Sequence, residues 1–115
     1  MLQGRRPQRI ADQIKSEVSQ IVSYELRDKR IGFTTVTDVW VSPDLKQTRI
    51  YVSVLGSKEE ARSTLEALNH AAGFVRHELG SRLRLRHAPQ LSFHIDKSIE
   101  YGDRIERLID QINRE

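Results

Sequence analysis

The sequence of 115 residues contains no cysteine, only three prolines and few aromatic residues. Without cysteine the chain cannot form disulfides, thiolate metal sites or a cysteine nucleophile, which fits a reducing cytosol. No apolar run approaches the roughly 20 residues that a membrane-spanning helix needs, and the N-terminal MLQGRRPQRI lacks the apolar stretch of a signal peptide. Length and composition therefore predict one soluble, cytoplasmic domain over residues 1–115, with a core built from Ile, Val and Leu.

Positive charge is concentrated in two parts of the chain. Residues 1–30 contain seven Lys/Arg against four Asp/Glu, and residues 61–90 contain five against two. Each cluster alone is explained equally well by solvated helix faces. Together they favour a polyanionic partner, because localised positive charge that neutralises phosphates is typical of nucleic-acid-binding proteins.

Three segments have the composition and alternation of β-strands, namely residues 33–42, 46–56 and 91–96. The turn signal SPDL joins the first two into a β-hairpin. In the first strand, strict alternation places Val39 and Val41 on one face, and Val36 and Trp40 on the other.

Apolar residues at helical spacing predict a helix over 7–27, a second one capped by Ser57, a third from Gly73 toward Pro89, and a terminal helix over 101–113. Residues 1–6 are expected to form a flexible basic arm. The order of elements indicates an α+β domain with helices on one face of a small sheet.

The segment Ala71-Ala72-Gly73 interrupts the helical pattern, and a glycine inside a helix costs about 1 kcal/mol relative to alanine. Close packing of two helices explains it. Alternatively, a bend frees N–H groups at the start of the second helix, where they attract phosphate. In KH domains a GxxG loop between two helices clamps a nucleic-acid backbone in this way. The element order here is that of the bacterial KH type, with Ala71-Ala72-Gly73 in place of GxxG.

Longer motifs in the same order identify a family. They are VTDVWVSPDL (36–45), IYVSVLG (50–56), ALNHAAGFVRHEL (67–79) and RLRLRHAPQLSFHIDKS (82–98). With these motifs the sequence resembles the ribosome-binding factor A family of bacterial small-subunit assembly factors, over nearly the whole chain. One departure is Asp28-Lys29-Arg30, where many relatives have Asp-Pro-Arg.

The resemblance implies a KH-like fold of type II (α-β-β-α-kink-α-β) with an Ala-x-Gly interhelical kink, here with an added C-terminal helix. It also implies binding to the free small (30S) ribosomal subunit near the 5′-terminal helix of 16S rRNA. The protein would assist late rRNA processing and maturation, especially in the cold.

The candidate RNA-binding residues are basic residues from both clusters: Arg5, Arg6, Arg9, Arg76, His77, Arg84 and Arg86. Arg76 lies in the first turn of the expected post-kink helix, where the helix dipole disfavours a cation, so we expect a phosphate or carboxylate partner. In a regular helix, Arg76, His77 and Arg84 would project to one side. The N-terminal arginines are explained almost as well by a frayed terminus, and Arg82 by a solvated position at the border of the core.

Trp40 and Tyr51 could stack on RNA bases, as aromatic residues do on RNA-binding sheets. Packing against the sheet or a neighbour explains Trp40 better, and neither residue is included among the candidate site residues.

The sequence gives no support for an enzyme, a metal site or a cofactor. The four histidines lack HExxH spacing, and there is no Walker-type glycine loop. We therefore expect a monomer that binds the small subunit and 16S rRNA, and neither a membrane nor a small-molecule substrate. The alternatives are a general KH-like RNA-binding module acting outside the ribosome and a protein-docking adaptor. Phosphate binding would weaken steeply with salt, whereas protein docking would hardly respond.

Overall fold

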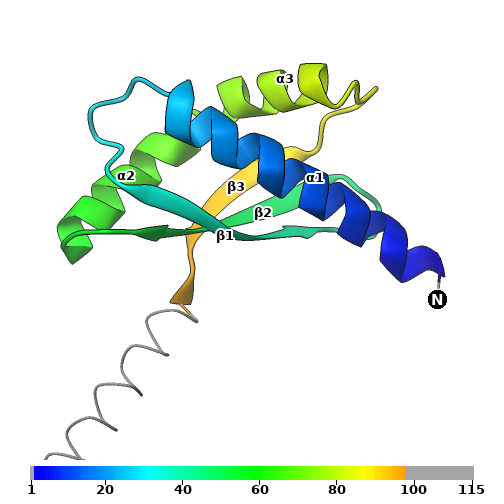
Figure 1. Ribbon diagram of the computed structural model, residues 1–115, viewed down its shortest axis with the longest axis horizontal. Helices are drawn as coiled ribbons and strands as arrows, with labels where there is room; N and C mark the ends of the chain where they lie inside the picture. Colours follow the sequence, from blue (N-terminus) through cyan, green and yellow to red (C-terminus); the bar gives the residue numbers. More distant parts are fainter. Residues whose placement is uncertain (1, 98–115) are drawn as a thin grey trace, which may run out of the picture.

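The structure is a computed structural model that describes the backbone of residues 2–97 and the side chains of residues 8–97. The elements are α1 (Leu2–Tyr24), β1 (Thr34–Val41), β2 (Gln47–Val54), α2 (Lys58–His70), α3 (Ala72–Arg82) and β3 (Gln90–Ile95). This order confirms the predicted α-β-β-α-α-β sequence (Figure 1). The terminal helix expected over 101–113 lies outside the described residues.

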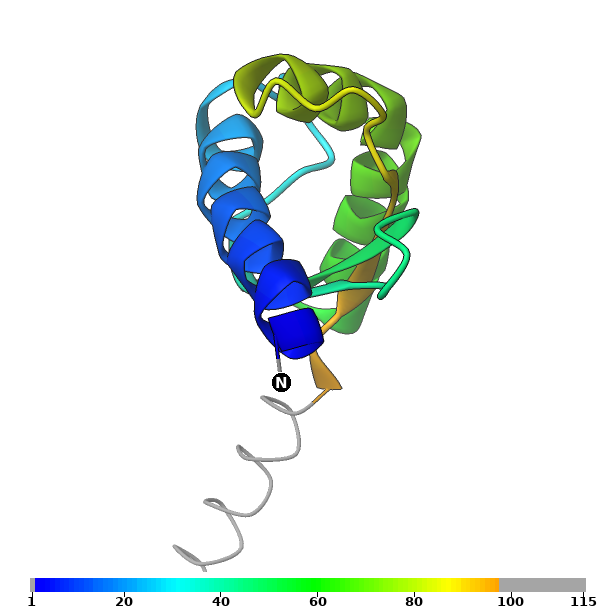
Figure 2. The ribbon, with the colours of Figure 1, turned by 90° about the vertical axis from the view of Figure 1, so that its right-hand side faces the viewer.

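A three-stranded sheet in the order β1-β2-β3 forms the base of the domain. β1 and β2 pair antiparallel as the predicted hairpin, and β3 returns parallel to β2. The three helices lie on one side of the sheet, and no other element within residues 2–97 covers its opposite face (Figures 1 and 2). The buried core lies between these layers, with Ile14, Ile50 and Phe93 among its largest fully buried side chains.

A β-bulge in β1 changes which side chains reach the core. Val36 pairs with Val52 and Asp38 with Tyr51, so Thr37 is an extra residue in the register of the hairpin. Because a bulge reverses the alternation of the following residues, Val36, Val39 and Val41 are all buried. The predicted strict alternation, which separates Val36 from Val39 and Val41, is therefore wrong.

The first helix begins at Leu2 rather than at Pro7, so residues 2–6 continue α1 instead of forming a separate arm. Leucine, glutamine and arginine in this segment are good helix formers, whereas its glycine and the following Pro7 are not. Ile14, Val18 and Ile21 recur at helical spacing and are fully buried. They hold α1 against β1 and α3.

The outer edge of β3 is covered by one side chain of α2. The Asn69 amide donates to the carbonyl of Phe93 at 3.2 Å and accepts from the N–H of Phe93 at 2.9 Å. An exposed strand edge is a template for pairing with another chain. Asn69 occupies this template at the middle of β3 and joins the edge to the helix that precedes the kink.

The turn after α1 is held by hydrogen bonds between Asp28 and Arg30. The Asp28 carboxylate accepts from the backbone N–H and the guanidinium of Arg30. These hydrogen bonds lower the pKa of Asp28 to about 2. Thr64 of α2 then donates to the carbonyl of Arg30 and accepts from the N–H of Gly32, which fastens the turn to the domain.

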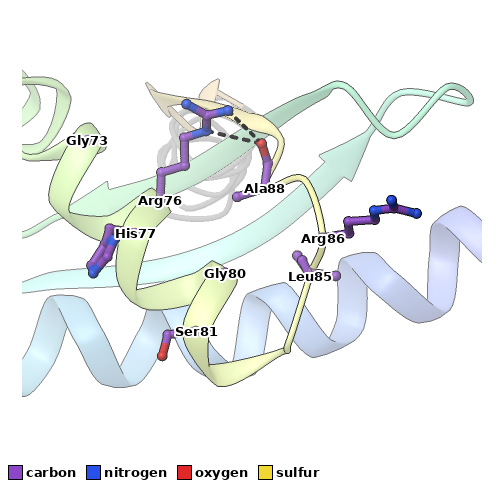
Figure 3. A pocket seen from close by; sticks show the side chains of 8 residues that line it. All are labelled: Gly73, Arg76, His77, Gly80, Ser81, Leu85, Arg86 and Ala88. Atoms are coloured by element: carbon purple, nitrogen blue, oxygen red, sulfur yellow. Dashed lines mark hydrogen bonds between the residues drawn. The ribbon is translucent and has the colours of Figure 1, made fainter.

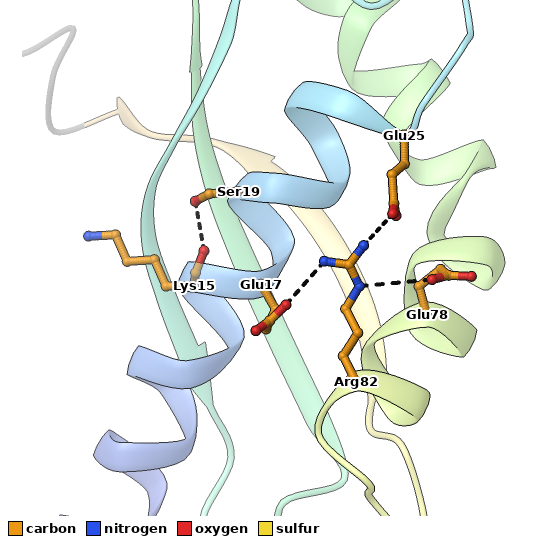
Figure 4. A network of polar contacts seen from close by, with 6 residues as sticks. All are labelled: Lys15, Glu17, Ser19, Glu25, Glu78 and Arg82. Atoms are coloured by element: carbon orange, nitrogen blue, oxygen red, sulfur yellow. Dashed lines mark hydrogen bonds and ion pairs between the residues drawn. The ribbon is translucent and has the colours of Figure 1, made fainter.

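Arg82 joins the end of α3 to α1 through a cluster of carboxylates (Figure 4). Its guanidinium contacts Glu17 at 3.1 Å, Glu25, and Glu78 at 3.9 Å. The hydrogen bond to Glu17 raises the pKa of Arg82 above its ordinary value. Only 26% of the Arg82 side chain is exposed, so this arginine borders the core as predicted, but it is paired rather than solvated.

Replacing Arg82 by methionine keeps most of the apolar stem and leaves three carboxylates close together without their cation. We expect a lower urea midpoint of unfolding with an unchanged m-value, because the native state loses its ion pairs and keeps the repulsion.

The matched control is Arg62→Met on α2, whose side chain is 82% exposed and lies 4.0 Å from Glu66. An exposed pair of this kind contributes little. Equal midpoints for the two variants would show that the Arg82 cluster does not hold α3 against α1.

Candidate nucleic-acid interface

The helical pair is interrupted at a single residue, Ala71. It ends α2 and precedes α3, with φ −83° and ψ 0°. Its N–H still donates to the carbonyl of Ala67, and its carbonyl accepts from Val75, so the two helices follow each other without a loop. No side chain caps α3, and its first turn has no acidic residue. The positive end of the helix dipole therefore remains uncompensated by side chains of α3.

Gly73 lies inside α3, and neither of the explanations from packing or bending applies to it. The break is at Ala71, and Gly73 does not have a positive φ. A Cβ added at Gly73 would meet nothing within 4 Å. Gly73 is therefore a place where the helix backbone is open to an approaching molecule.

One face of α3 packs against the rest of the domain, and the opposite face is exposed. Val75, Leu79 and Arg82 recur at helical spacing and face the core and α1. The other face is formed by residues at matching spacing, namely Gly73, Arg76, His77, Gly80 and Ser81. Since two of these five have no side chain, this face is low and open at its centre.

A surface hollow of about 500 Å³ lies on this open face (Figure 3). We call it the α3 hollow, and it is lined by Gly73, Arg76, His77, Gly80, Ser81, Leu85, Arg86 and Ala88. The lining contains two arginines and one histidine but no acidic residue. It therefore has the shape and the charge to receive part of a phosphodiester backbone.

Arg76 has partners that neither expected possibility included. Its Nε donates to the carbonyls of Ala88 and Pro89 at 3.1 and 3.2 Å, and Nη2 donates to Ala88 at 2.8 Å. The guanidinium thus holds the loop before β3 against α3 while it lines the hollow (Figure 3). A hydrogen-bonded arginine keeps its charge, so Arg76 still contributes positive potential.

Arg84 does not lie on the helix with Arg76 and His77, which corrects the expectation of a common side. The helix ends at Arg82, and Arg84 has a positive φ of 52°. The N–H of Leu85 donates to the carbonyl of Gly80 at 3.0 Å, and that of Arg84 to Ser81 at 3.4 Å. These are the bonds of a Schellman motif, which ends a helix and favours glycine at the position of Arg84.

The structure brings four predicted residues to the α3 hollow, namely Gly73, Arg76, His77 and Arg86. Arg86 extends from the loop away from the helix (Figure 3). Arg84 is exposed in the adjoining turn, and Arg9 is exposed on α1, outside the hollow. Arg5 and Arg6 belong to α1, but their side chains lie outside the described part.

Gly80, Ser81, Leu85 and Ala88 also line the hollow and were not predicted. A Cβ at Gly80 would lie 3.3 Å from the Cβ of Ala88, so this glycine lets the loop close against α3. The spacing of Gly73 and Gly80, seven residues apart, already places both on one face of a helix. That signal was available in the sequence.

Two absences concern the described residues alone. Within residues 2–97, no three His, Asp or Glu side chains are grouped in a way that could hold a metal ion. Over the same range, no helix combines the length and apolar character needed to cross a membrane.

Comparison with known proteins agrees with the fold and the motifs. The family model of ribosome-binding factor A matches residues 6–109. The ribosome-binding factor A of Staphylococcus epidermidis is 46% identical over 109 residues, which cover 95% of this chain and 94% of that protein.

Solved structures show the same relationship. A crystal structure of ribosome-binding factor A from Thermus thermophilus matches with a TM-score of 0.68 and 27% identity, over 77% of this chain and 94% of that one. A homology model of the T. thermophilus factor, fitted into a cryo-EM map of a 30S–RbfA complex, matches with a TM-score of 0.64 and 29% identity. The match covers 76% of this chain and 91% of that one. The solution structure of a Thermotoga maritima protein described as a putative ribosome-binding factor A matches with a TM-score of 0.58 and 33% identity. The match covers 79% of this chain and 83% of that one. The chain has the KH-like fold of these proteins and belongs to the ribosome-binding factor A family.

Proposed function

We propose that this protein binds the free small ribosomal subunit near the 5′-terminal helix of 16S rRNA and assists late rRNA processing, above all in the cold. It acts in the cytoplasm as a monomer, by binding alone and without a cofactor. Family membership and the fit of a T. thermophilus relative into a 30S complex support the partner. The observation that carries the proposal is the α3 hollow, which joins basic side chains to an open helix backbone.

The mechanism is preferential binding to one conformation of the rRNA. A binding protein shifts a conformational equilibrium only by its differential affinity for the two states. Gly73 supplies an unobstructed approach to the backbone, while Arg76, His77 and Arg86 supply donors and charge around it. An rRNA segment whose phosphates follow this arrangement would be stabilised over competing folds.

Co-sedimentation with purified small subunits, large subunits and whole ribosomes across a salt series tests the partner and the surface together. We expect binding to free small subunits alone, with an affinity that falls as salt rises. Arg84→Ala/Arg86→Ala should weaken this binding and reduce the salt slope by roughly one for each phosphate that is no longer neutralised.

Arg76 is left intact in this variant because it holds the loop before β3. Arg62→Ala is the control for loss of surface charge, since Arg62 is exposed on α2. Unchanged binding by the double variant would exclude the α3 surface. Binding of unrelated RNA as tightly as subunits would favour the general RNA-binding module instead.

Gly73→Ala tests whether the open backbone is used. The added methyl group meets nothing within 4 Å, and alanine favours a helix over glycine by up to about 1 kcal/mol. We expect equal or higher stability in urea together with weaker binding to small subunits, because the methyl group occupies the space that a phosphate would approach. Wild-type affinity in this variant would show that the rRNA backbone stays away from Gly73.

Arg84→Gly separates the cost of the turn from the use of the side chain. Glycine adopts the left-handed conformation without the steric cost of roughly 1 kcal/mol that an ordinary residue has there. The urea midpoint of unfolding should therefore rise. Subunit binding should fall, since the guanidinium is lost. Arg84→Ala should lose binding to the same degree without the gain in stability. A gain in stability with undiminished binding would remove Arg84 from the interface.

A further inference from the structure

The face of the sheet that the helices leave open has an aromatic and polar surface of its own. On this face Trp40 and Arg49 are paired across β1 and β2, and Tyr51 and His94 are paired across β2 and β3. The guanidinium carbon of Arg49 lies 4.8 Å from the centre of the Trp40 ring. The rings of Tyr51 and His94 are 5.7 Å apart. An arginine–tryptophan pair and a pair of rings tilted by 37° thus occupy neighbouring rows of the sheet.

Trp40 separates two hollows of similar size. One, of about 330 Å³, lies on the sheet among Asp38, Trp40, Arg49, Tyr51 and Asp96. The other, of about 320 Å³, lies between β1 and α1 and includes Gln8 and Asp12. Trp40 is 43% exposed although it is the largest side chain in the sequence. Its ring packs against the neighbouring Arg49, as predicted, and the rest of the ring is accessible beside both hollows.

We propose that this open sheet face binds unpaired RNA bases, with one base stacked on Trp40 and Arg49 and the next on Tyr51 and His94. This inference rests on the proposed rRNA binding and adds a second contact surface to it. Aromatic rings and arginine planes are the surfaces on which proteins stack splayed bases. The two pairs are two residues apart along β2, about 7 Å. This separation is comparable with the distance between successive bases of an extended RNA strand.

Acidic residues in the sheet hollow favour a base over a phosphate there. The Asp38 carboxylate accepts from the N–H of Val39 at 2.9 Å, which fixes its orientation, and Asp96 accepts from the Thr37 hydroxyl at 2.6 Å. Carboxylates repel phosphate but accept from exocyclic amino groups such as N4 of cytosine. The phosphates would run outside the hollow, away from these carboxylates.

Composition makes RNA a better occupant than a protein. Besides Trp40 and Tyr51, the described side chains on this face are short, polar or charged, as at Thr35, Arg49 and His94. A protein interface needs an apolar centre. The most exposed apolar side chains are Tyr24 at 84%, Phe33 at 83% and Leu55 at 77%. Phe33 and Leu55 lie at the far end of the hairpin, where the N–H of Leu55 donates to the carbonyl of Phe33, and neither lines the sheet hollow.

The single tryptophan of the chain provides a direct test. Trp40 fluorescence is followed while oligocytidylate, oligoadenylate or oligouridylate hexamers are added at low and moderate salt. We expect saturable quenching, stronger with the cytosine and adenine oligomers because uracil lacks an exocyclic amino group. Asp38→Ala should remove this preference, whereas Glu59→Ala, an exposed acid on α2, should retain it.

Affinity is measured independently by the anisotropy of a labelled hexamer. Trp40→Ala should weaken binding by roughly five- to a hundredfold, the range expected when one base loses its stacking partner, and Trp40→Phe should restore part of it. Thermal unfolding of both variants checks that the fold is intact.

Three outcomes would overturn the inference: no quenching by any hexamer, equal quenching by inorganic polyphosphate, or quenching by an arginine-rich peptide but not by RNA. The last would assign the face to a protein. Failure here leaves the proposed function standing if small subunits still sediment with the protein and Arg84→Ala/Arg86→Ala still weakens that binding. Hexamer quenching without subunit binding would support the sheet face and reject the ribosomal partner.

Discussion

The attachment of α3 to α1 through Arg82 is the interaction on which the candidate interface depends. Arg82 contacts one carboxylate on α1, one directly after α1 and one on its own helix, and Val75 and Leu79 bury the same side of α3. With that side fixed, the opposite side must face solvent. The α3 hollow is therefore a consequence of where the core-facing residues lie, and the orientation of its basic groups needs no partner to establish it.

Apolar periodicity predicted the elements well because burial against one sheet dictates it. Bounds at the ends of α1 and the effect of the bulge at Thr37 were not predictable, since a bulge depends on how two strands pair. The contacts of the arginines likewise divide into those that the sequence predicts and those that depend on distant parts of the chain. That Arg82 differs from its neighbours follows from alternation along the chain, but Glu17 is 65 residues away, and no local pattern identifies it. Arg76 likewise bonds to carbonyls, groups that every residue has and that sequence cannot single out.

Two positions combine an unfavourable local choice with an exposed place beside the hollow. Gly73 weakens a helix in which alanine would fit, and Arg84 adopts a left-handed conformation that glycine would adopt at lower cost. Residues that break a local rule without a packing reason are the ones expected at functional sites. Gly73 lines the α3 hollow together with Arg86, and Arg84 lies two residues before Arg86 in the turn that ends α3.

The two surfaces differ in the physics by which they would bind RNA. The α3 hollow offers charge and open backbone, so it would read the path of phosphates and respond strongly to salt. The open sheet face offers rings, an arginine and carboxylates, so it would read unpaired bases by stacking and hydrogen bonding. An rRNA segment that satisfies both must present a backbone path and unstacked bases at a fixed separation. Such a combined requirement discriminates between conformations of one RNA better than either surface alone, because the differential free energies of the two surfaces add.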